Sequence, residues 1–244
     1  MRPLSDCDIL EIWERAQTQH PIDRALTLLK RGFPGATWEE LVNLTVGQRN
    51  RRLLVLREGT LGSRLMGFSE CPACGVALDF MLRTEDLLAA DSEPRSDQEQ
   101  TVRVDGFEVS YRCPNSQDLA AIVSCEHVTA ARKLLMKRCV NRVTHKGVDL
   151  GIESAPGDVI ATVVEEIVKS DTFAELEIDL CCPDCGHQWL MPLDIVAFFW
   201  EEISAKANRL LEEVHTLALA YGWNEMDILS MSVRRRRFYF EMVT

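Results

Sequence analysis

Two copies of one short cysteine pattern stand far apart in this chain. The first reads Cys71-Pro72-Ala73-Cys74-Gly75 and the second Cys182-Pro183-Asp184-Cys185-Gly186. In each copy, two thiols separated by two residues can reach the same ion, and the glycine that follows can adopt the positive φ that a tight turn around the sulfurs requires. Together the copies supply four thiolates, which complete a tetrahedral shell and leave no open position for water or substrate. We therefore predict a structural Zn2+ held by Cys71, Cys74, Cys182 and Cys185.

Other uses of paired cysteines fit these residues less well. A redox dithiol usually follows a βαβ pattern and does not occur twice with the same Pro and Gly. Residues 1–6 lead into no apolar run of a secretory signal, so we expect a reducing, cytoplasmic compartment, where disulfides do not persist. His187 and Cys181 are alternative ligands beside the second pair, although the repeated pattern favours Cys182 and Cys185.

No catalytic arrangement is evident in the rest of the sequence. There is no glycine-rich phosphate loop, no His-Glu-x-x-His and no Gly-x-Ser-x-Gly. A second metal site would have to use residues separated by 12, 2 and 12 positions, which match no zinc pattern: Cys113, Cys125, His127 and Cys139. We expect buried thiols there and predict a protein that is not an enzyme and has no small-molecule substrate.

Composition describes a folded protein with an acidic balance. The chain has 244 residues, of which 46% are hydrophobic and 27% charged, close to the average of globular proteins. Its longest apolar stretch, residues 195–200, is far too short to cross a membrane, so we expect no membrane insertion. With 27 basic and 38 acidic side chains the net charge is −11, which repels nucleic acid.

Each cysteine pair is predicted to lie at the tip of a β-hairpin. Apolar and polar residues alternate along residues 76–83, after the first pair, and along 175–180 and 189–193, on either side of the second. Because one ion needs both tips, the chain must return to its starting place after a long insertion. We therefore expect a four-cysteine zinc ribbon with its halves in residues 63–90 and 172–193.

The other segments are predicted to be mostly helical, which makes the fold class α+β, mainly helical. Residues 1–62 form an N-terminal helical segment in which the arginines of residues 45–57 look like a solvated face. Residues 91–171 form a mixed insertion with a polar loop (91–100), a hairpin around Asp105-Gly106, and helices near 116–123, 126–140 and 156–170. We expect one compact unit, although a division into two domains stays open.

A C-terminal helical segment, residues 194–244, contains the longest predicted helix. Asp194 is its expected N-cap and Gly222 its expected C-terminal stop, and apolar residues repeat at heptad spacing from Val196 to Tyr221. We favour packing of this helix on the chain's own helices over a seam shared with another protein, since further apolar residues widen its face: Phe198, Phe199 and Leu211.

Four consecutive arginines, Arg234 to Arg237, follow near the end of the chain. Ser232 is the expected N-cap of the last helix, so these arginines occupy its first turn and a half, where positive charge opposes the helix dipole. The placement suggests an acidic neighbour, either within the chain, which the sequence favours, or on a partner.

Several of these segments resemble one protein family. The stretches that carry the likeness are Leu44-Thr45-Val46-Gly47-Gln48-Arg49-Asn50-Arg51-Arg52-Leu53-Leu54, Thr60-Leu61-Gly62, Leu78-Asp79-Phe80, and residues 220–232 with Arg234, Arg235 and Tyr239. They resemble baseplate proteins, also described as baseplate hub assembly chaperones, of contractile phage tails and phage-tail-like injection systems. The likeness covers the first 90 and the last 70 residues well and the middle poorly.

The resemblance implies a non-enzymatic role in placing or chaperoning the central hub and spike. Hub, spike, tube or wedge proteins would be the partners. Candidate partner-binding residues lie in the closing stretch: Trp223, Arg234, Arg235, Arg236 and Tyr239. An alternative function is that of a zinc-ribbon nucleic-acid-binding or regulatory protein, because such ribbons and arginine-rich helices recur in that class. The net charge of −11 argues against it.

Overall fold

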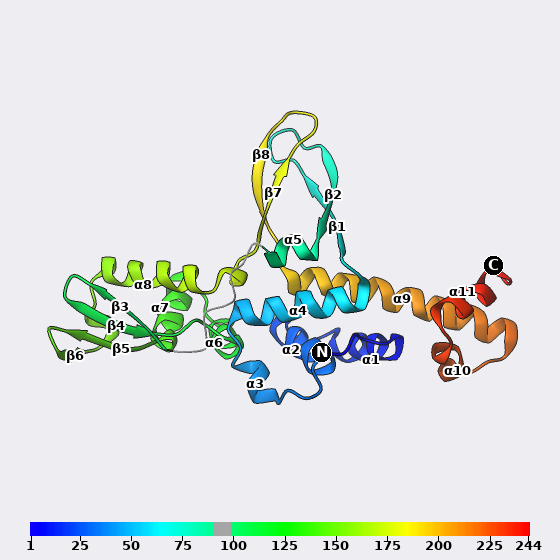
Figure 1. The fold of residues 1–244 in the computed structure, drawn as a ribbon, viewed down its shortest axis with the longest axis horizontal. Helices are drawn as coiled ribbons and strands as arrows, with labels where there is room; N and C mark the ends of the chain where they lie inside the picture. Colours follow the sequence, from blue (N-terminus) through cyan, green and yellow to red (C-terminus); the bar gives the residue numbers. More distant parts are fainter. Residues whose placement is uncertain (90–98) are drawn as a thin grey trace.

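The computed structural model of the chain describes residues 1–89 and 99–244. Its helices and small antiparallel sheets form three arms around a helical centre (Figure 1). A ribbon of four strands stands on one side of this centre, the inserted sheet lies at one end, and the long helix α9 extends to the other. The predicted α+β class, mainly helical, is confirmed. The polar loop expected at residues 91–100 falls mostly outside the described residues.

The N-terminal helices begin where the sequence provides side-chain caps. They are α1 (Asp6–Ala16), α2 (Pro21–Gly32), α3 (Trp38–Val42) and α4 (Val46–Leu61). In α1, α3 and α4, a Ser or Thr hydroxyl accepts a backbone N–H three residues later, while the acid or amide at that position accepts the cap's own N–H. Their apolar faces bury Ile9, Leu28 and Leu53 in a common core with the first half of α9 (Ile195–Tyr221).

The arginines of α4 do not form the solvated face expected from the sequence. Arg49 and Arg57 are buried, and Arg51 and Arg52 are half-buried. The prediction was wrong for Arg57 because this residue pairs with Glu202, 145 residues further along the chain, and helical periodicity carries no information about so distant a partner.

The insertion folds around a four-stranded antiparallel sheet in the order β3-β4-β5-β6. Its elements are β3 (Gln100–Val104), β4 (Phe107–Tyr111), α6 (Ser116–Ile122), α7 (Val128–Cys139), β5 (Val140–His145), β6 (Val148–Leu150), η1 (Ile152–Ser154), α8 (Gly157–Ser170) and η2 (Thr172–Ala174). The predicted hairpin around Asp105-Gly106 is confirmed, as are the three helices. A core of its own joins the sheet to the two helices through Val109 and Val143 on the strands, Met136 on α7 and Val163 on α8.

Two hairpins make up the ribbon. β1 (Arg64–Glu70) pairs with β2 (Ala77–Arg83), and β7 (Glu177–Cys181) pairs with β8 (Gln188–Pro192), each in antiparallel register. At their foot, Phe80 and Leu82 of the first hairpin join Ile178 and Leu180 of the second in a small apolar cluster. The helix α5 (Thr84–Ala89) follows β2 and adds Leu87 to this cluster.

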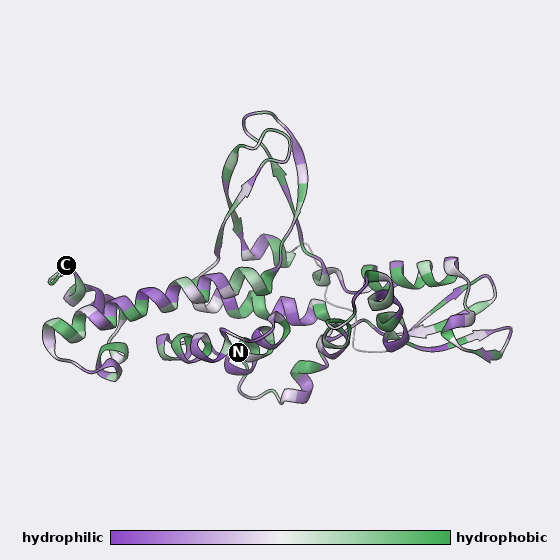
Figure 2. Cartoon of the chain, turned by 180° about the vertical axis from the view of Figure 1, so that it is seen from behind, coloured by the Kyte–Doolittle hydropathy of each residue, from purple (hydrophilic) through white to green (hydrophobic). Residues whose placement is uncertain are grey.

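Helix α9 is the axis of the molecule. Asp194 caps it by accepting the N–H groups of Val196 and Ala197, and Gly222 ends it with a positive φ of 70°. Its hydrophobic residues gather beneath the ribbon, and its course toward α10 is more hydrophilic (Figure 2). Six of the heptad positions are buried among the chain's own helices, as favoured from the sequence: Val196, Trp200, Ile203, Ala207, Leu210 and Leu217. The short helices α10 (Glu225–Ser230) and α11 (Val233–Glu241) complete the chain.

Candidate metal centre and its supporting contacts

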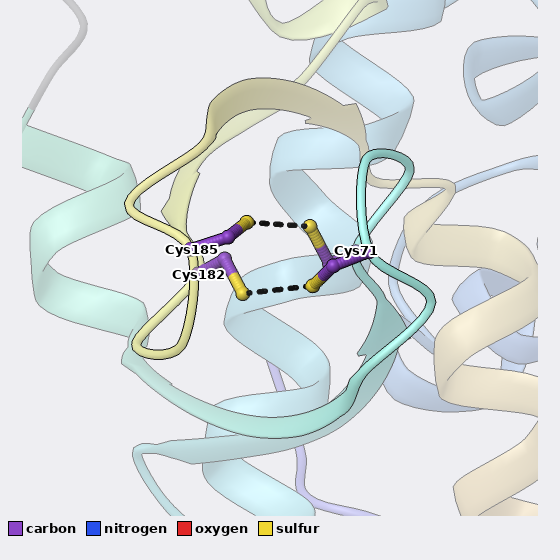
Figure 3. Close-up of side chains that lie close together, drawn as sticks. Cys71, Cys182 and Cys185 are labelled. Carbon is purple, nitrogen blue, oxygen red and sulfur yellow. Dashed lines mark hydrogen bonds between the residues drawn. The ribbon is translucent and has the colours of Figure 1, made fainter.

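The four predicted ligands come together between the tips of the two hairpins. All their sulfurs lie within 4.8 Å of one another. The Cys71 and Cys185 sulfurs are 3.7 Å apart and those of Cys74 and Cys182 are 3.6 Å apart, each pair joining one hairpin to the other (Figure 3). A disulfide would need about 2 Å. Four thiolates bound to one zinc at about 2.3 Å would be about 3.8 Å apart, so the arrangement could hold a tetrahedral metal ion.

Identical backbone turns position the two pairs of sulfurs. The N–H of Gly75 donates to the carbonyl of Cys71 at 2.8 Å, and the N–H of Gly186 donates to that of Cys182 at 3.0 Å. Both glycines have positive φ, 72° and 71°, which turns the following backbone back toward the sulfurs. The role predicted for these glycines from the sequence is therefore seen in the structure.

The thiols compete with one another for ionisation. Burial raises the pKa of Cys71, but the N–H groups of Cys74 and Ala73 aimed at its sulfur, with neighbouring thiols, outweigh this and bring the pKa to about 7. The Val76 N–H lowers the pKa of Cys74, yet the thiols of the other three residues and burial raise it to about 12. Four such groups cannot all ionise side by side without a cation, whereas a bound divalent ion keeps its thiolate ligands deprotonated.

The alternative ligands stay outside this cluster. His187 stacks on Trp189, with ring centroids 6.0 Å apart, and the exposed Cys181 makes only long contacts to backbone carbonyls. Cys113 and Cys139 are buried thiols, as expected, whereas Cys125 is only half-buried. Across residues 1–89 and 99–244, no other set of three or more His, Cys, Asp or Glu side chains gathers its donor atoms closely enough to bind a metal.

A buried arginine fixes the foot of the first hairpin. Arg57, at the end of α4, donates to both carboxylate oxygens of Glu202 on α9, from Nε at 2.8 Å and from Nη2 at 2.5 Å. The same guanidinium donates to the carbonyls of Gly62 and Arg64, where the chain enters β1. Bidentate, charge-assisted bonds of this kind hold a fixed geometry, so the ribbon is set at a defined angle on α4 and α9.

A second buried contact closes the insertion onto α4. The Asp171 carboxylate, just after α8, accepts the Thr45 hydroxyl at 2.8 Å and the Gly47 N–H at 2.9 Å. These donors stand at the N-terminus of α4, where backbone N–H groups lack helical partners and a negative charge is favoured. Asn50 adds a bond from its side-chain amide to the carbonyl of Phe173. The sequence stretch from Leu44 to Leu54 therefore includes the residues that form hydrogen bonds with the chain where it leaves the insertion.

The four C-terminal arginines have different environments. Arg236 is fully buried and donates from Nη2 to Asp6 and from Nε to Glu213, each at 2.6 Å. Arg237 is exposed and pairs with Glu241 at 2.8 Å. Arg234 and Arg235 are exposed. The favoured expectation of an acidic partner within the chain thus describes Arg236 and Arg237, and the enclosed Arg236 positions α11 rather than facing a partner.

Trp223 and Tyr239 belong to one aromatic cluster. Trp223 stacks on Tyr221 with ring centroids 4.4 Å apart, and the ring of Tyr239 stands edge-on to Trp223 at 5.0 Å. The cluster joins the end of α9 to α11, and both residues are half-buried. Contact of Trp223, Arg234, Arg235 or Tyr239 with a partner stays a prediction.

Comparison with known proteins confirms the family noted in the sequence, but the match runs through the middle of the chain and ends before the closing stretch of residues 220–232 that carried part of the likeness. The sequence profile of the family described as T4 bacteriophage base plate protein matches residues 15–200, a span that includes both cysteine pairs. No curated protein and no solved structure matches the chain. None of the helices in the described residues has the length and apolarity needed to span a membrane. Since the profile covers well over half of the sequence, the chain belongs to the T4 bacteriophage base plate protein family, which supports a structural, non-enzymatic role among other baseplate components.

Proposed function

We propose that the chain is a structural or assembly protein of the baseplate hub of a contractile phage tail or contractile injection system, stabilised by one structural zinc ion. The family match that spans both halves of the ribbon carries this proposal. Hub, spike, tube or wedge proteins are the proposed partners. Binding takes place in the bacterial cytosol, where the particle is assembled and where thiols stay reduced.

The zinc in this proposal stabilises the fold and performs no chemistry. Four thiolates fill a tetrahedral shell, so the ion has no open position at which water or a substrate could be activated. Its effect is to clasp hairpins that are separated by more than 100 residues of sequence. Such a clasp suits a protein that must present a fixed surface to large neighbours.

The three-armed shape supports a role in joining other proteins. The inserted sheet and the C-terminal helices lie at opposite ends of the molecule, and the ribbon stands between them (Figure 1). Several large apolar side chains remain exposed on the ribbon and at the C-terminal end, including Met66, Phe68, Met226 and Phe238. Exposed apolar side chains of this kind are found at protein interfaces.

The test is co-expression of the chain with each baseplate protein encoded beside it. We expect stable co-purification with a hub, spike or wedge protein, and loss of normal baseplates from particles when the gene is deleted. Mass spectrometry of purified particles then separates the two forms of the proposal, because a structural protein remains in the particle and a chaperone leaves it. Normal particles from the deletion strain would count against both.

A further inference from the structure

We infer that the outer face of α11, formed by Arg234, Arg235, Arg237 and Phe238, docks an acidic segment of another baseplate protein. The inference rests on the proposed function and specifies the chemistry of one partner surface. It differs from the sequence-based set of candidate residues because Arg236 is enclosed, Trp223 packs on Tyr221, and Phe238 joins the face.

Part of the positive charge on α11 has no acidic partner among the described residues. Arg236 engages the nearby carboxylates of Asp6 and Glu213, and Arg237 engages Glu241. Within the described residues, no carboxylate lies within ion-pair distance of Arg234 or Arg235. The guanidinium of Arg235 lies over the ring of Tyr239, 5.7 Å from the ring centre. Two positive charges thus have no acidic partner within the described residues of a protein whose net charge is −11.

These charges lie at the N-terminus of α11. Ser232 caps α11 by accepting the N–H of Arg235, so the arginines follow directly on the cap. The first turn of α11 carries arginines and no acidic residue. Positive charge near a helix N-terminus opposes the dipole, so an arriving carboxylate relieves an unfavourable interaction as well as forming new bonds.

Helix α11 is fixed in place by buried and aromatic contacts. The buried Arg236 ties α11 to α1 through Asp6 and to α9 through Glu213, and Tyr239 packs on the aromatic rings at the end of α9. The outward face is therefore held before any partner arrives, which lowers the entropy lost on binding. Phe238, with 63% of its surface exposed, shares a shallow hollow with Arg234 and Arg235. Arginine and aromatic side chains grouped in this way are typical of residues that dominate interface energies.

The overall charge favours an acidic peptide segment over nucleic acid. A duplex or long single strand would meet the negative surface of the whole chain, whereas a few carboxylates contact only this face within a Debye length of about 8–10 Å. Guanidinium groups bind carboxylates in a planar bidentate manner, which adds specificity. The occupant is thus a segment with two or more Asp or Glu residues and an apolar side chain that covers Phe238.

The experiment measures the affinity of the full-length chain for the co-encoded baseplate protein that co-purifies with it. We compare the wild type with Arg234→Glu/Arg235→Glu. The matched control is Arg132→Glu/Lys133→Glu, which reverses two adjacent exposed charges on α7 and changes the net charge equally. Equal zinc content and melting temperature show that both variants are folded.

We expect the α11 variant to bind at least about 10-fold more weakly and the α7 control to bind like the wild type. Reversal of the partner's acidic residues to Lys should restore binding to the α11 variant. Unchanged affinity of the α11 variant would overturn the inference while leaving the proposed function intact, whereas a wild-type chain that binds no baseplate protein would count against the function itself. Two other results would also overturn the inference. One is salt-sensitive binding of the wild type to a 30-base-pair DNA duplex, and the other is self-association of the wild type, if in either case only the α11 variant loses it.

Discussion

The backbone N–H of Gly47 donates to the carboxylate of Asp171 at 2.9 Å, across 124 residues of sequence. The approach is so close that a Cβ built on Gly47 would lie 2.1 Å from Oδ1 of Asp171 and 3.0 Å from the N atom of Ala174. Glycine is therefore required here for space and not for its backbone conformation. This contact sets the point at which the returning chain reaches α4.

Replacement of Gly47 by Ala should destabilise the protein by about 1–2 kcal/mol. Overpacking and weakening of a charge-assisted hydrogen bond together cost about 2–3 kcal/mol, and the better helix propensity of Ala offsets up to about 1 kcal/mol. Urea unfolding measures the difference. Gly35→Ala is the control, since nothing lies within 4 Å of a Cβ at that position. Equal stability of the two variants would show that Asp171 moves aside freely.

The metal centre is tested by metal analysis of the purified chain. We expect one zinc per chain in the wild type and little or none in Cys74→Ser or Cys185→Ser, because each removes one of four ligands. Cys181→Ser is the matched control, an adjacent exposed thiol outside the cluster. A chelator should lower the melting temperature of the wild type and of this control. If Cys181→Ser lost its zinc as well, the assignment of the ligands would be wrong.

Two neighbouring arginines of α11 should differ in how much they stabilise the protein, because Arg236 is buried and Arg237 is exposed. We expect Arg236→Ala to cost about 2–4 kcal/mol, because it leaves the carboxylates of Asp6 and Glu213, which are 16% and 28% exposed, without their buried partner. Arg237→Ala, next along the chain, should cost no more than about 0.5 kcal/mol, since it removes an exposed i,i+4 pair. Hydrogen exchange of residues 224–241 gives the local readout. Equal protection in the two variants would contradict this assignment.

Asp8 should make stability depend on pH in the acid range. Its burial opposes ionisation, but hydrogen bonds from the backbone N–H and hydroxyl of Ser5, with Arg31 and Arg2, lower its pKa from 3.8 to about 2. A depressed pKa in the folded state means that the carboxylate stabilises the protein fully above about pH 4–5, and that this contribution is lost as pH falls toward 2.

We therefore expect Asp8→Asn to be less stable than the wild type by about 2 kcal/mol at pH 7, and most of this difference to be lost by about pH 2. Urea unfolding at several pH values measures it. Glu14→Gln is the control, an exposed acid on the same helix. A difference that stays constant with pH would attribute the effect to packing and not to charge.

Local signals were sufficient to predict most of the ribbon and the helices. The cysteine spacing, the following glycines and the alternation around them are all properties of neighbouring residues, and they identified the four sulfurs that cluster in the structure. Caps such as Asp194 and Ser232 also act within a few residues. Where the determinant is local, the sequence is informative.

The missed features depend on distant partners or on a weaker local signal. The buried positions of Arg57 and Arg236 are explained by Glu202, Glu213 and Asp6, which no periodicity links to them. The hairpin of β5 and β6 was not predicted, although Lys146-Gly147 has the positive φ angles, 50° and 81°, of a two-residue turn. Its short second strand, of three residues, offered too little alternation to be recognised.

The distance along the chain between the two halves of the ribbon also orders events during synthesis. Cys74 leaves the ribosome 108 residues before Cys182, which at bacterial elongation rates corresponds to about 5–20 s. During that interval the first hairpin can offer an ion only two thiolates, and by its end the N-terminal helices and the inserted sheet have their full sequences. Closure of the ribbon can therefore follow the synthesis of the insertion and precede that of α9, α10 and α11, which then pack against a base whose two hairpins are already joined.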